Sequence, residues 1–361
     1  MSLRILSCPD VDRISGTFTT EQLQTLMAQV FFYISDGRDV VTPHRSSIQM
    51  LNHRALFMPA RIAGIGTSIK VVSVPTAAGS THGLPGSTLV LDETTGAAKA
   101  LVNASSLTAL RTAAGSLLAT TLLYPPTISH PKMLVAFGAG KQILAHVDLL
   151  LATYPSLQEV TIVNRSMNQR TSTLVSEFRS RHPSVKFDVG VHNASSSDLA
   201  SPFDLPTAVA SADIICTATS STVPLFPSAS VRPGTHLILV GSYTIAMAEI
   251  DTDLVRRAKT IVVDSREACL IEAGELIAAG VGEDEMIELG ELVQETNPGA
   301  LEGTMWEWKR NEHKCDEVRK AGDVTIFKSV GVGAQDVAIA AAVVDRAKEL
   351  GIGATVEDYD A

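Results

Sequence analysis

MLVAFGAGKQILAHVDLLLATYPSLQEVTIVNRS, residues 133–166, is the stretch that decides the fold of this chain. It begins with a short apolar run at 133–137 and turns through Gly138-Ala139-Gly140. Apolar residues at helical spacing follow over 143–151, and a second apolar run at 160–163 comes near the end. Strand, glycine turn, helix and strand in this order are typical of a dinucleotide-binding unit, in which helix N–H groups and the positive end of the helix dipole face a diphosphate.

The glycines alone also fit an ordinary turn in a parallel sheet, because Ile143 stands where the dinucleotide fingerprint has a third Gly or Ala. The flanking strands and helix favour nucleotide binding. An NAD site usually has a carboxylate at the tip of the second strand, for the ribose hydroxyls. This chain has Asn164-Arg165-Ser166 there, with Arg170 downstream, and an arginine suits a 2′-phosphate. The sequence therefore predicts NADP(H) as the preferred cofactor, with NAD(H) possible.

Composition limits the classes of protein to which the chain can belong. A length of 361 residues with 45% hydrophobic residues predicts two domains with large cores. The net charge of −10 argues against a nucleic-acid partner, and no apolar run approaches the roughly 18 residues of a membrane span. The four cysteines are dispersed without a Cys-x-x-Cys pair, so neither a metal site nor a disulfide framework is expected. The N-terminus lacks the apolar core of a signal peptide, and a cytoplasmic protein is expected.

Two kinds of pattern divide the remainder of the sequence. Residues 41–102 carry short β-branched segments broken by Gly and Pro, which indicate a mixed domain dominated by antiparallel sheet. From residue 132, apolar runs alternate with helical segments, which indicates an α/β Rossmann fold, a doubly wound parallel sheet. The strands expected there are 133–137, 160–163, 185–189, 213–217, 236–240 and 260–263. Residues 281–322 show little periodicity and are expected to be a solvated excursion, followed by strand 324–329 and helix 334–350.

One long helix, predicted over 104–123, carries a single charged residue, Arg111. An arginine on an apolar helix either extends its head group to the surface or has an anionic partner, because an unpaired buried charge is costly. We favour an anion site at Arg111, since the planar guanidinium matches a carboxylate.

Five spaced segments of the chain share their pattern with one known family. They are SIKVVSVPTAAGSTHGLPGSTLVLDETTG (68–96), LTALRTAAGSLLAT (107–120), VGSYTIAMAEID (240–251), VVDSREACLIEAGEL (262–276) and TIFKSVGVGAQDVAIAAAVV (325–344). With the glycine turn and the Asn-Arg-Ser tip in the same order, the chain resembles the ornithine cyclodeaminase/μ-crystallin family over nearly its whole length. The resemblance implies a Rossmann domain, residues 128–324, inserted in a mixed α+β substrate-binding and dimerisation domain of residues 1–127 plus 325–361. It also implies a homodimer.

The resemblance further implies the residues of a site. The carboxylate of a small amino or imino acid would be held by Arg45, Lys70 and Arg111, with Ser242 and Tyr243 near the substrate, and Lys70 and Arg111 would be catalytic. The cofactor would be bound by Thr112, Gly138, Ala139, Gly140 and Gln142 at the diphosphate, by Asn164, Arg165 and Ser166 at the adenosine ribose and its 2′-phosphate, by Thr217, Ala218 and Thr219 at the ribose, and by Val240, Gly241 and Ser242 near the nicotinamide. Each loop residue also fits ordinary turn chemistry, and Lys70 also fits a solvated strand lysine.

The chain departs from the pattern of the family's cyclodeaminases at one position. Those enzymes carry an aspartate after the strand and glycine pair, where this chain has Gly241-Ser242-Tyr243. Hydride transfer needs positioning, a carboxylate clamp and a proton source, so the loss of that base favours reduction over deamination. We therefore predict an NADPH-dependent reductase of a ketimine or imino acid, active in amino acid metabolism. An ornithine cyclodeaminase-type lyase using NAD+ and a non-catalytic NADPH-binding protein of the μ-crystallin kind are the alternatives.

Overall fold

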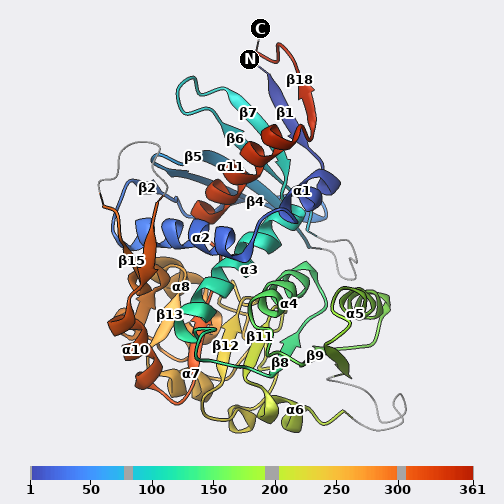
Figure 1. Ribbon diagram of the computed structural model, residues 1–361, viewed down its shortest axis with the longest axis vertical. Helices are drawn as coiled ribbons and strands as arrows, with labels where there is room; N and C mark the ends of the chain where they lie inside the picture. The colour runs from blue at the N-terminus through green and yellow to red at the C-terminus, as the bar shows by residue number, and fades with distance from the viewer. Residues whose placement is uncertain (1, 77–83, 192–202, 299–305, 361) are drawn as a thin grey trace. The chain divides into compact units, whose positions relative to one another are not determined.

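The computed structural model describes residues 2–76, 84–191, 203–298 and 306–360, and the chain forms two compact units (Figure 1). The first unit comprises Met1–Thr112 with Gly331–Ala361, and the second comprises Ala113–Val330. The first division falls inside one helix, α3 (Ala104–Leu123), so the helix predicted over 104–123 belongs to both units.

The first unit is built on a mixed sheet covered by a long helix. Among the described residues its strands follow the order β18-β1-β7-β6-β5-β4-β2, with β3 beside β4, and every neighbouring pair except β1 with β7 is antiparallel. The bounds are β1 Leu3–Leu6, β2 Val40–Val41, β3 Ser46–Gln49, β4 His53–Ile62, β5 Gly66–Pro75, β6 Gly86–Leu91, β7 Ala98–Asn103 and β18 Ala354–Val356. Helix α11 (Gly333–Leu350) packs on β4 and β5, and α1 (Cys8–Ser15) and α2 (Thr20–Ser35) pack against α11 (Figure 1).

Burial along β5 shows which face of this sheet α11 covers. Ser68 and Lys70 are buried, while Ile69 between them is only partly buried. Successive side chains of a strand point to opposite faces, so Ser68 and Lys70 lie on one face. The first turn of α11 is itself buried, and Asp336 of that turn contacts Lys70. This strand and this helix turn therefore place polar groups within an otherwise apolar layer.

The second unit contains a parallel sheet of the Rossmann type. In the described residues its order is β10-β9-β8-β11-β12-β17-β13-β14, and every neighbouring pair is parallel. The strands are β8 Met133–Phe137, β9 Glu159–Asn164, β10 Lys186–Val191, β11 Ile214–Thr217, β12 His236–Leu239, β13 Ile261–Val263, β14 Met286–Glu288 and β17 Thr325–Lys328. The helices are α4 Lys141–Thr153, α5 Gln169–Arg181, α6 Leu205–Ser211, α7 Thr252–Ala258, α8 Arg266–Glu272, α9 Gly274–Ala278 and α10 Glu312–Ala321. The predicted fold class is confirmed.

The six strands predicted for the parallel sheet are present, and their ends differ from the prediction by at most two residues. A seventh strand, β17, departs from the prediction, because the domain bounds implied by the resemblance assign it to the other domain. It pairs with β12 and β13 inside the parallel sheet, and all four of its residues are buried, as a strand covered on both faces requires. The second unit therefore extends to Val330 instead of ending at residue 324.

The prediction of a solvated excursion at 281–322 is wrong in the residues that the structure describes there. β14 is the edge strand of the parallel sheet, β15 (Val293–Glu295) pairs with β16 (Trp308–Arg310), and α10 follows. Each of these strands has three residues, too few for a periodic pattern to be recognised.

Two buried histidines link α3, α4 and β12. Burial lowers the pKa of His146 to about 4 and that of His236 to about 3, so both rings are neutral at neutral pH. His146 Nδ1 donates to the carbonyl of Gln142 at 2.7 Å, which leaves its Nε2 to accept from Ser116 Oγ at 2.9 Å. Thr120 Oγ1 donates to the carbonyl of Ser116, so it accepts from His236 Nε2 at 3.2 Å. These bonds fix α3 against β12 and against α4, the helix that directly follows the glycine turn.

Candidate active site

Charged residues of the first unit meet at the first turn of α11. Lys70 on β5 and Arg111 on α3 are 2% and 4% exposed. Asp336 accepts from Lys70 Nζ at 2.6 Å through Oδ2 and from Arg111 Nε at 3.2 Å through Oδ1. Arg111 Nη1 also donates to Gln335 Oε1 at 2.8 Å. The structure thus brings the two predicted catalytic residues onto one carboxylate.

This cluster carries more positive than negative charge. Two cations share Asp336, and Arg45, half-buried just before β3, adds a third positive charge that acts on Lys70. Burial is the main cause that lowers the pKa of Lys70 to about 8; Asp336 opposes this shift, and Arg111 and Arg45 add to it. Because an unpaired buried charge is costly, an excess of buried positive charge favours an anionic ligand.

Asp336 is the member of the cluster that sequence reasoning missed. It lies in the first turn of a helix, where the helix dipole favours a carboxylate. Gln335-Asp336 is also the only polar pair in the apolar first half of that helix, 333–342, and this is the signal by which it is recognisable. Gly331 also lies close to the guanidinium: it has φ +83°, and a Cβ there would lie 3.0 Å from both Nη atoms of Arg111. Close approach of Arg111 therefore requires glycine at position 331.

A cavity of about 390 Å³ lies in the second unit, at the carboxyl ends of β8, β9 and β11. Predicted cofactor residues that line it are Gly138, Ala139, Gly140, Asn164, Arg165, Ala218 and Thr219, and the other lining residues are Phe137, Val163, Arg170 and 220–225. Gln142, Ser166, Thr217, Val240, Gly241 and Ser242 are not among the lining residues, and Thr112 belongs to the first unit. Doubly wound sheets bind their ligands at this edge.

The glycine turn leaves helix donors open to a ligand. Gly138 has φ +118°, and a Cβ there would lie 2.9 Å from the Ala218 carbonyl oxygen and 3.4 Å from Ile143 Cγ1. Ile143, the exception to the fingerprint, is thus buried behind the turn. Gly140 is the N-cap of α4 and provides no capping side chain for the first N–H groups of the helix. Gln142 Oε1 is buried without a hydrogen-bond partner in the described residues, and a half-turn of its amide would put the NH2 group there. A diphosphate suits this set of donors.

Two exposed arginines, Arg165 and Arg170, line the same cavity beyond the tip of β9. Asn164 is held in place at that tip, because its Nδ2 donates to Thr171 Oγ1 at 2.8 Å and to the carbonyl of Ser166 at 3.2 Å. A pair of guanidinium groups is a suitable partner for a phosphate.

Hydroxyl groups at the ends of β11 and β12 form hydrogen bonds within the protein. Thr217 Oγ1 donates to Glu249 Oε2 at 2.7 Å, and Ser242 Oγ donates to the carbonyl of Met247 at 3.0 Å. Both residues are fully buried. The hydroxyl groups of Thr217 and Ser242 therefore donate their hydrogen bonds within the protein, and these residues contribute to ligand binding by fixing the nearby backbone.

The two carboxylates that follow half-buried Tyr243 in the sequence are also engaged. Glu249 is 0% exposed and is bound by the ends of β11 and β12. Asp251 is the N-cap of α7 and accepts from Leu254 N at 2.8 Å. Within the described segment 240–251, neither carboxylate is offered to a substrate amine.

A parallel sheet with an open helix end, together with a mixed unit that holds a buried cationic cluster, defines a two-unit protein of the Rossmann class. The chain belongs to the ornithine cyclodeaminase/mu-crystallin family, whose sequence model matches residues 5–351. The resemblance inferred from the sequence is thereby confirmed.

Two relatives that match most of this chain are named as reductases. A Delta(1)-pyrroline-2-carboxylate reductase of Paracoccus denitrificans (strain Pd 1222) is 33% identical over 287 residues, 78% of this chain and 79% of its own length. The ketimine reductase mu-crystallin of Mus musculus is 30% identical over 318 residues, 86% of this chain and 87% of its own.

Solved structures show the same fold. Delta(1)-pyrroline-2-carboxylate reductase of Thermococcus litoralis, in complex with NADH and L-proline, has a TM-score of 0.78 at 23% identity and covers 98% of this chain and 100% of its own. The iminosuccinate reductase of Paracoccus denitrificans, in complex with NAD+, has a TM-score of 0.75 at 25% identity and covers 99% of each chain. In the described part of this chain, no helix is long and apolar enough to cross a membrane, and no group of three or more His, Cys, Asp or Glu side chains is placed to hold a metal ion.

Proposed function

We propose that this protein is an NADPH-dependent reductase of a small ketimine or imino acid, acting on a C=N bond beside a carboxylate. The observation that carries the proposal is the buried cluster in which Lys70 and Arg111 share Asp336, since its excess positive charge suits one substrate carboxylate. The family relatives support it, because a pyrroline-2-carboxylate reductase and a ketimine reductase both reduce C=N bonds.

Each residue has a role that follows from its chemistry. Nη2 of Arg111 makes no hydrogen bond within the described residues, so the guanidinium has donors left for a substrate carboxylate, with Arg45 as a second cation. Below its pKa of about 8, Lys70 holds a proton at Nζ that it gives to the substrate nitrogen. When bound, NADPH supplies the hydride that the imine carbon accepts. The product is the corresponding amino acid.

An assay of NADPH oxidation tests the proposal directly. With a panel of pyrroline-2-carboxylate, piperideine-2-carboxylate and linear ketimines, absorbance at 340 nm should fall for at least one substrate. Protein that binds NADPH yet oxidises it with no member of the panel would contradict the proposal. Release of ammonia from ornithine without net formation of NADH would instead establish a cyclodeaminase.

The preference for NADPH rests on the arginines at the tip of β9. Arg165→Asp is expected to weaken NADPH binding about tenfold to a hundredfold and NADH binding far less, because a charge-assisted contact contributes roughly 1.5–3 kcal/mol. Fluorescence titration of both cofactors measures the two Kd values. Arg181→Asp is the matched control, since Arg181 is exposed, lies on α5 and does not line the cavity. Equal weakening of both cofactors by Arg165→Asp would mean that Arg165 does not bind the 2′-phosphate.

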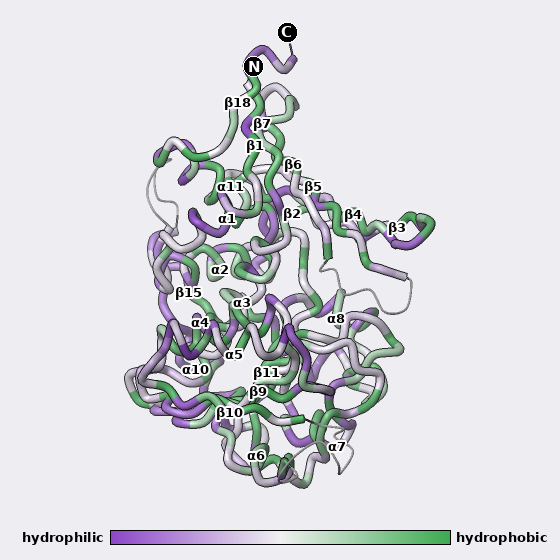
Figure 2. The backbone as a smooth tube through the Cα atoms, turned by 90° about the vertical axis from the view of Figure 1, so that its right-hand side faces the viewer, coloured by the Kyte–Doolittle hydropathy of each residue, from purple (hydrophilic) through white to green (hydrophobic). Residues whose placement is uncertain are grey.

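A homodimer is the proposed assembly, and the β3–β4 hairpin is its proposed contact. This hairpin carries apolar residues at its tip (Figure 2), and Ile48, Met50 and Leu51 are 59%, 43% and 94% exposed. A large exposed apolar patch marks an interaction surface more often than a free one. Light scattering should give twice the chain mass of 38.2 kDa, and a monomer mass would contradict the proposal.

A further inference from the structure

Glu249 is a buried carboxylate that accepts hydrogen bonds from four donors on two strand ends. Its Oε1 accepts from Thr219 N at 2.7 Å and from Thr219 Oγ1 at 2.8 Å. Its Oε2 accepts from Thr217 Oγ1 at 2.7 Å and from Gly241 N at 2.7 Å. Thr217 is the last residue of β11, Thr219 follows that strand and Gly241 follows β12, so one side chain joins the ends of two neighbouring parallel strands.

The donors around Glu249 match an ionised carboxylate. Burial raises the pKa of Glu249, and the nearby charge of Lys328 and the hydrogen bonds from both threonines act in the opposite direction. Two of the four partners are backbone N–H groups, one at each oxygen, and such groups only donate. A carboxamide in the same place would turn its NH2 group toward one of these N–H groups and lose that bond.

The space around this carboxylate has no room for a side chain at Gly241. A Cβ there would lie 2.1 Å from the Thr219 carbonyl oxygen and 2.3 Å from Glu249 Oε1. Two backbone hydrogen bonds also join the segment after β11 to the loop that carries Glu249. Ala248 N donates to the Ser221 carbonyl at 3.0 Å, and Leu225 N donates to the Glu249 carbonyl at 2.9 Å. Segment 218–225 forms one wall of the 390 Å³ cavity. The loop that carries Glu249 is thus hydrogen-bonded along the back of that wall.

We propose that Glu249 is a positioning residue for the dinucleotide, which holds the turn after β11 and the start of the loop after β12 in the conformation that receives the cofactor. The inference rests on the proposed use of a nicotinamide dinucleotide. Glu249 lies behind the cavity wall and is not one of its lining residues, so it acts through Thr219 and Gly241. A wall assembled before the ligand arrives reduces the ordering cost of binding.

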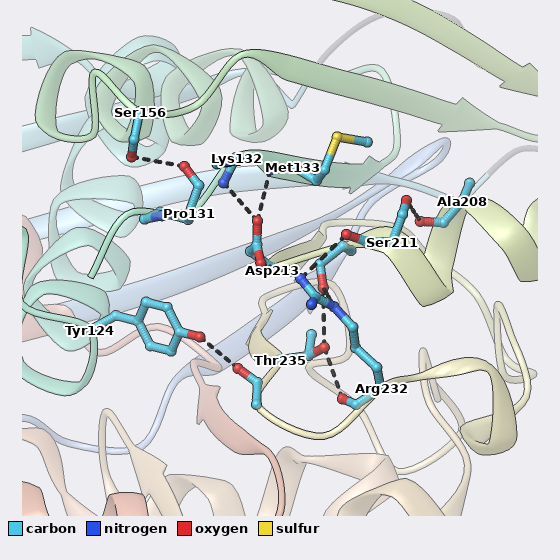
Figure 3. Close-up of polar contacts among 12 residues, drawn as sticks. Tyr124, Pro131, Lys132, Met133, Ser156, Ala208, Ser211, Asp213, Arg232 and Thr235 are labelled. Carbon is cyan, nitrogen blue, oxygen red and sulfur yellow. Dashed lines mark hydrogen bonds and ion pairs between the residues drawn. The ribbon is translucent and has the colours of Figure 1, made fainter. Parts of the chain in front are cut away.

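Asp213 provides a matched control at the opposite end of the strands of the same sheet, and Figure 3 shows the polar contacts that it makes. Its Oδ2 accepts from Lys132 N at 2.6 Å and from Met133 N at 3.0 Å, and its other oxygen is bound by Arg232. Like Glu249, it is a carboxylate that binds backbone N–H groups of strand ends. It differs in lying at the amino ends of β8 and β11, away from the cavity.

The test compares NADPH binding by the full-length wild type, Glu249→Gln and Asp213→Asn, well below the unfolding midpoint of each. Glu249→Gln is expected to raise the Kd at least about tenfold, since one charge-assisted bond is lost and a donor faces a donor. At saturating NADPH its KM for the imino acid should stay within about twofold of wild type. Asp213→Asn should leave the Kd for NADPH within about twofold. Hydrogen exchange should quicken at 217–225 and 241 in Glu249→Gln only.

Should Glu249→Gln not fold, Glu249→Asp keeps the charge but is one methylene too short to reach both strand ends. It is expected to raise the Kd about threefold or more. An unchanged Kd in the glutamine or aspartate variant, or an equal rise in Asp213→Asn, would overturn the positioning role. Wild-type protein that binds neither NADPH nor NADH would overturn the proposed function instead, so the two failures are distinguishable.

Discussion

Arg111→Met is expected to lower kcat/KM for the imino acid about a hundredfold to a thousandfold, while the Kd for NADPH stays within about twofold. The substitution removes a buried, hydrogen-bonded cation that we propose binds the substrate carboxylate, and such truncations cost about 2–5 kcal/mol. Arg111 contacts Asp336 and Gln335 of the first unit, whereas the cavity proposed to bind the dinucleotide is lined by residues of the second. Steady-state kinetics and cofactor titration separate the two effects.

Two variants serve as controls for this result. Arg111→Lys keeps the charge without the planar fork, so its kcat/KM should lie between those of wild type and Arg111→Met. Arg61→Met removes an arginine of the same unit whose side chain is 39% exposed and pairs with Asp39 and Glu93. Its kcat/KM should match that of wild type. An unchanged kcat/KM in folded Arg111→Met would show that Arg111 has only a structural role.

The Rossmann unit is predictable from the sequence because its signals are local. A buried strand, a glycine turn and an amphipathic helix follow one another within residues 133–151, and β8 and α4 form there. Arg111 is recognisable for a similar reason, as the one charged residue in a 20-residue helix. Such features depend on neighbours in the chain and not on how the chain folds back on itself.

The remainder of the site depends on long-range packing. Asp336 lies 266 residues from Lys70 in the sequence, and only the packing of α11 on β5 brings them together. The hydrogen-bond partner of Thr217 likewise depends on long-range packing, although a threonine at this position suits a ribose contact. The structure directs its hydroxyl to Glu249, 32 residues farther on. Sequence patterns thus indicate which polar groups lie at strand ends, but the tertiary structure determines the hydrogen-bond partner of each hydroxyl.

Asp336→Asn is expected to move the basic limb of the kcat/KM profile to lower pH. The pKa of Lys70 is about 8, and Asp336 raises it against burial and the charges of Arg111 and Arg45. In the proposed function the cationic form of Lys70 is the active one, so wild-type kcat/KM should be level below about pH 8 and should fall above it. Removing the negative charge disfavours the cation, and the limb should shift down by about one to three pH units.

Asp345→Asn is the matched control for this shift, because Asp345 lies on the same helix but is 63% exposed and pairs with Lys99 and Lys348. Its profile should coincide with that of wild type. All three proteins act on the same substrate, so ionisation of the substrate itself cannot produce a difference between them. A limb that stays at the wild-type pH in Asp336→Asn would assign the titration to a group other than Lys70. A wild-type kcat/KM that rises with pH through about 8, instead of falling, would mean that Lys70 acts in its neutral form.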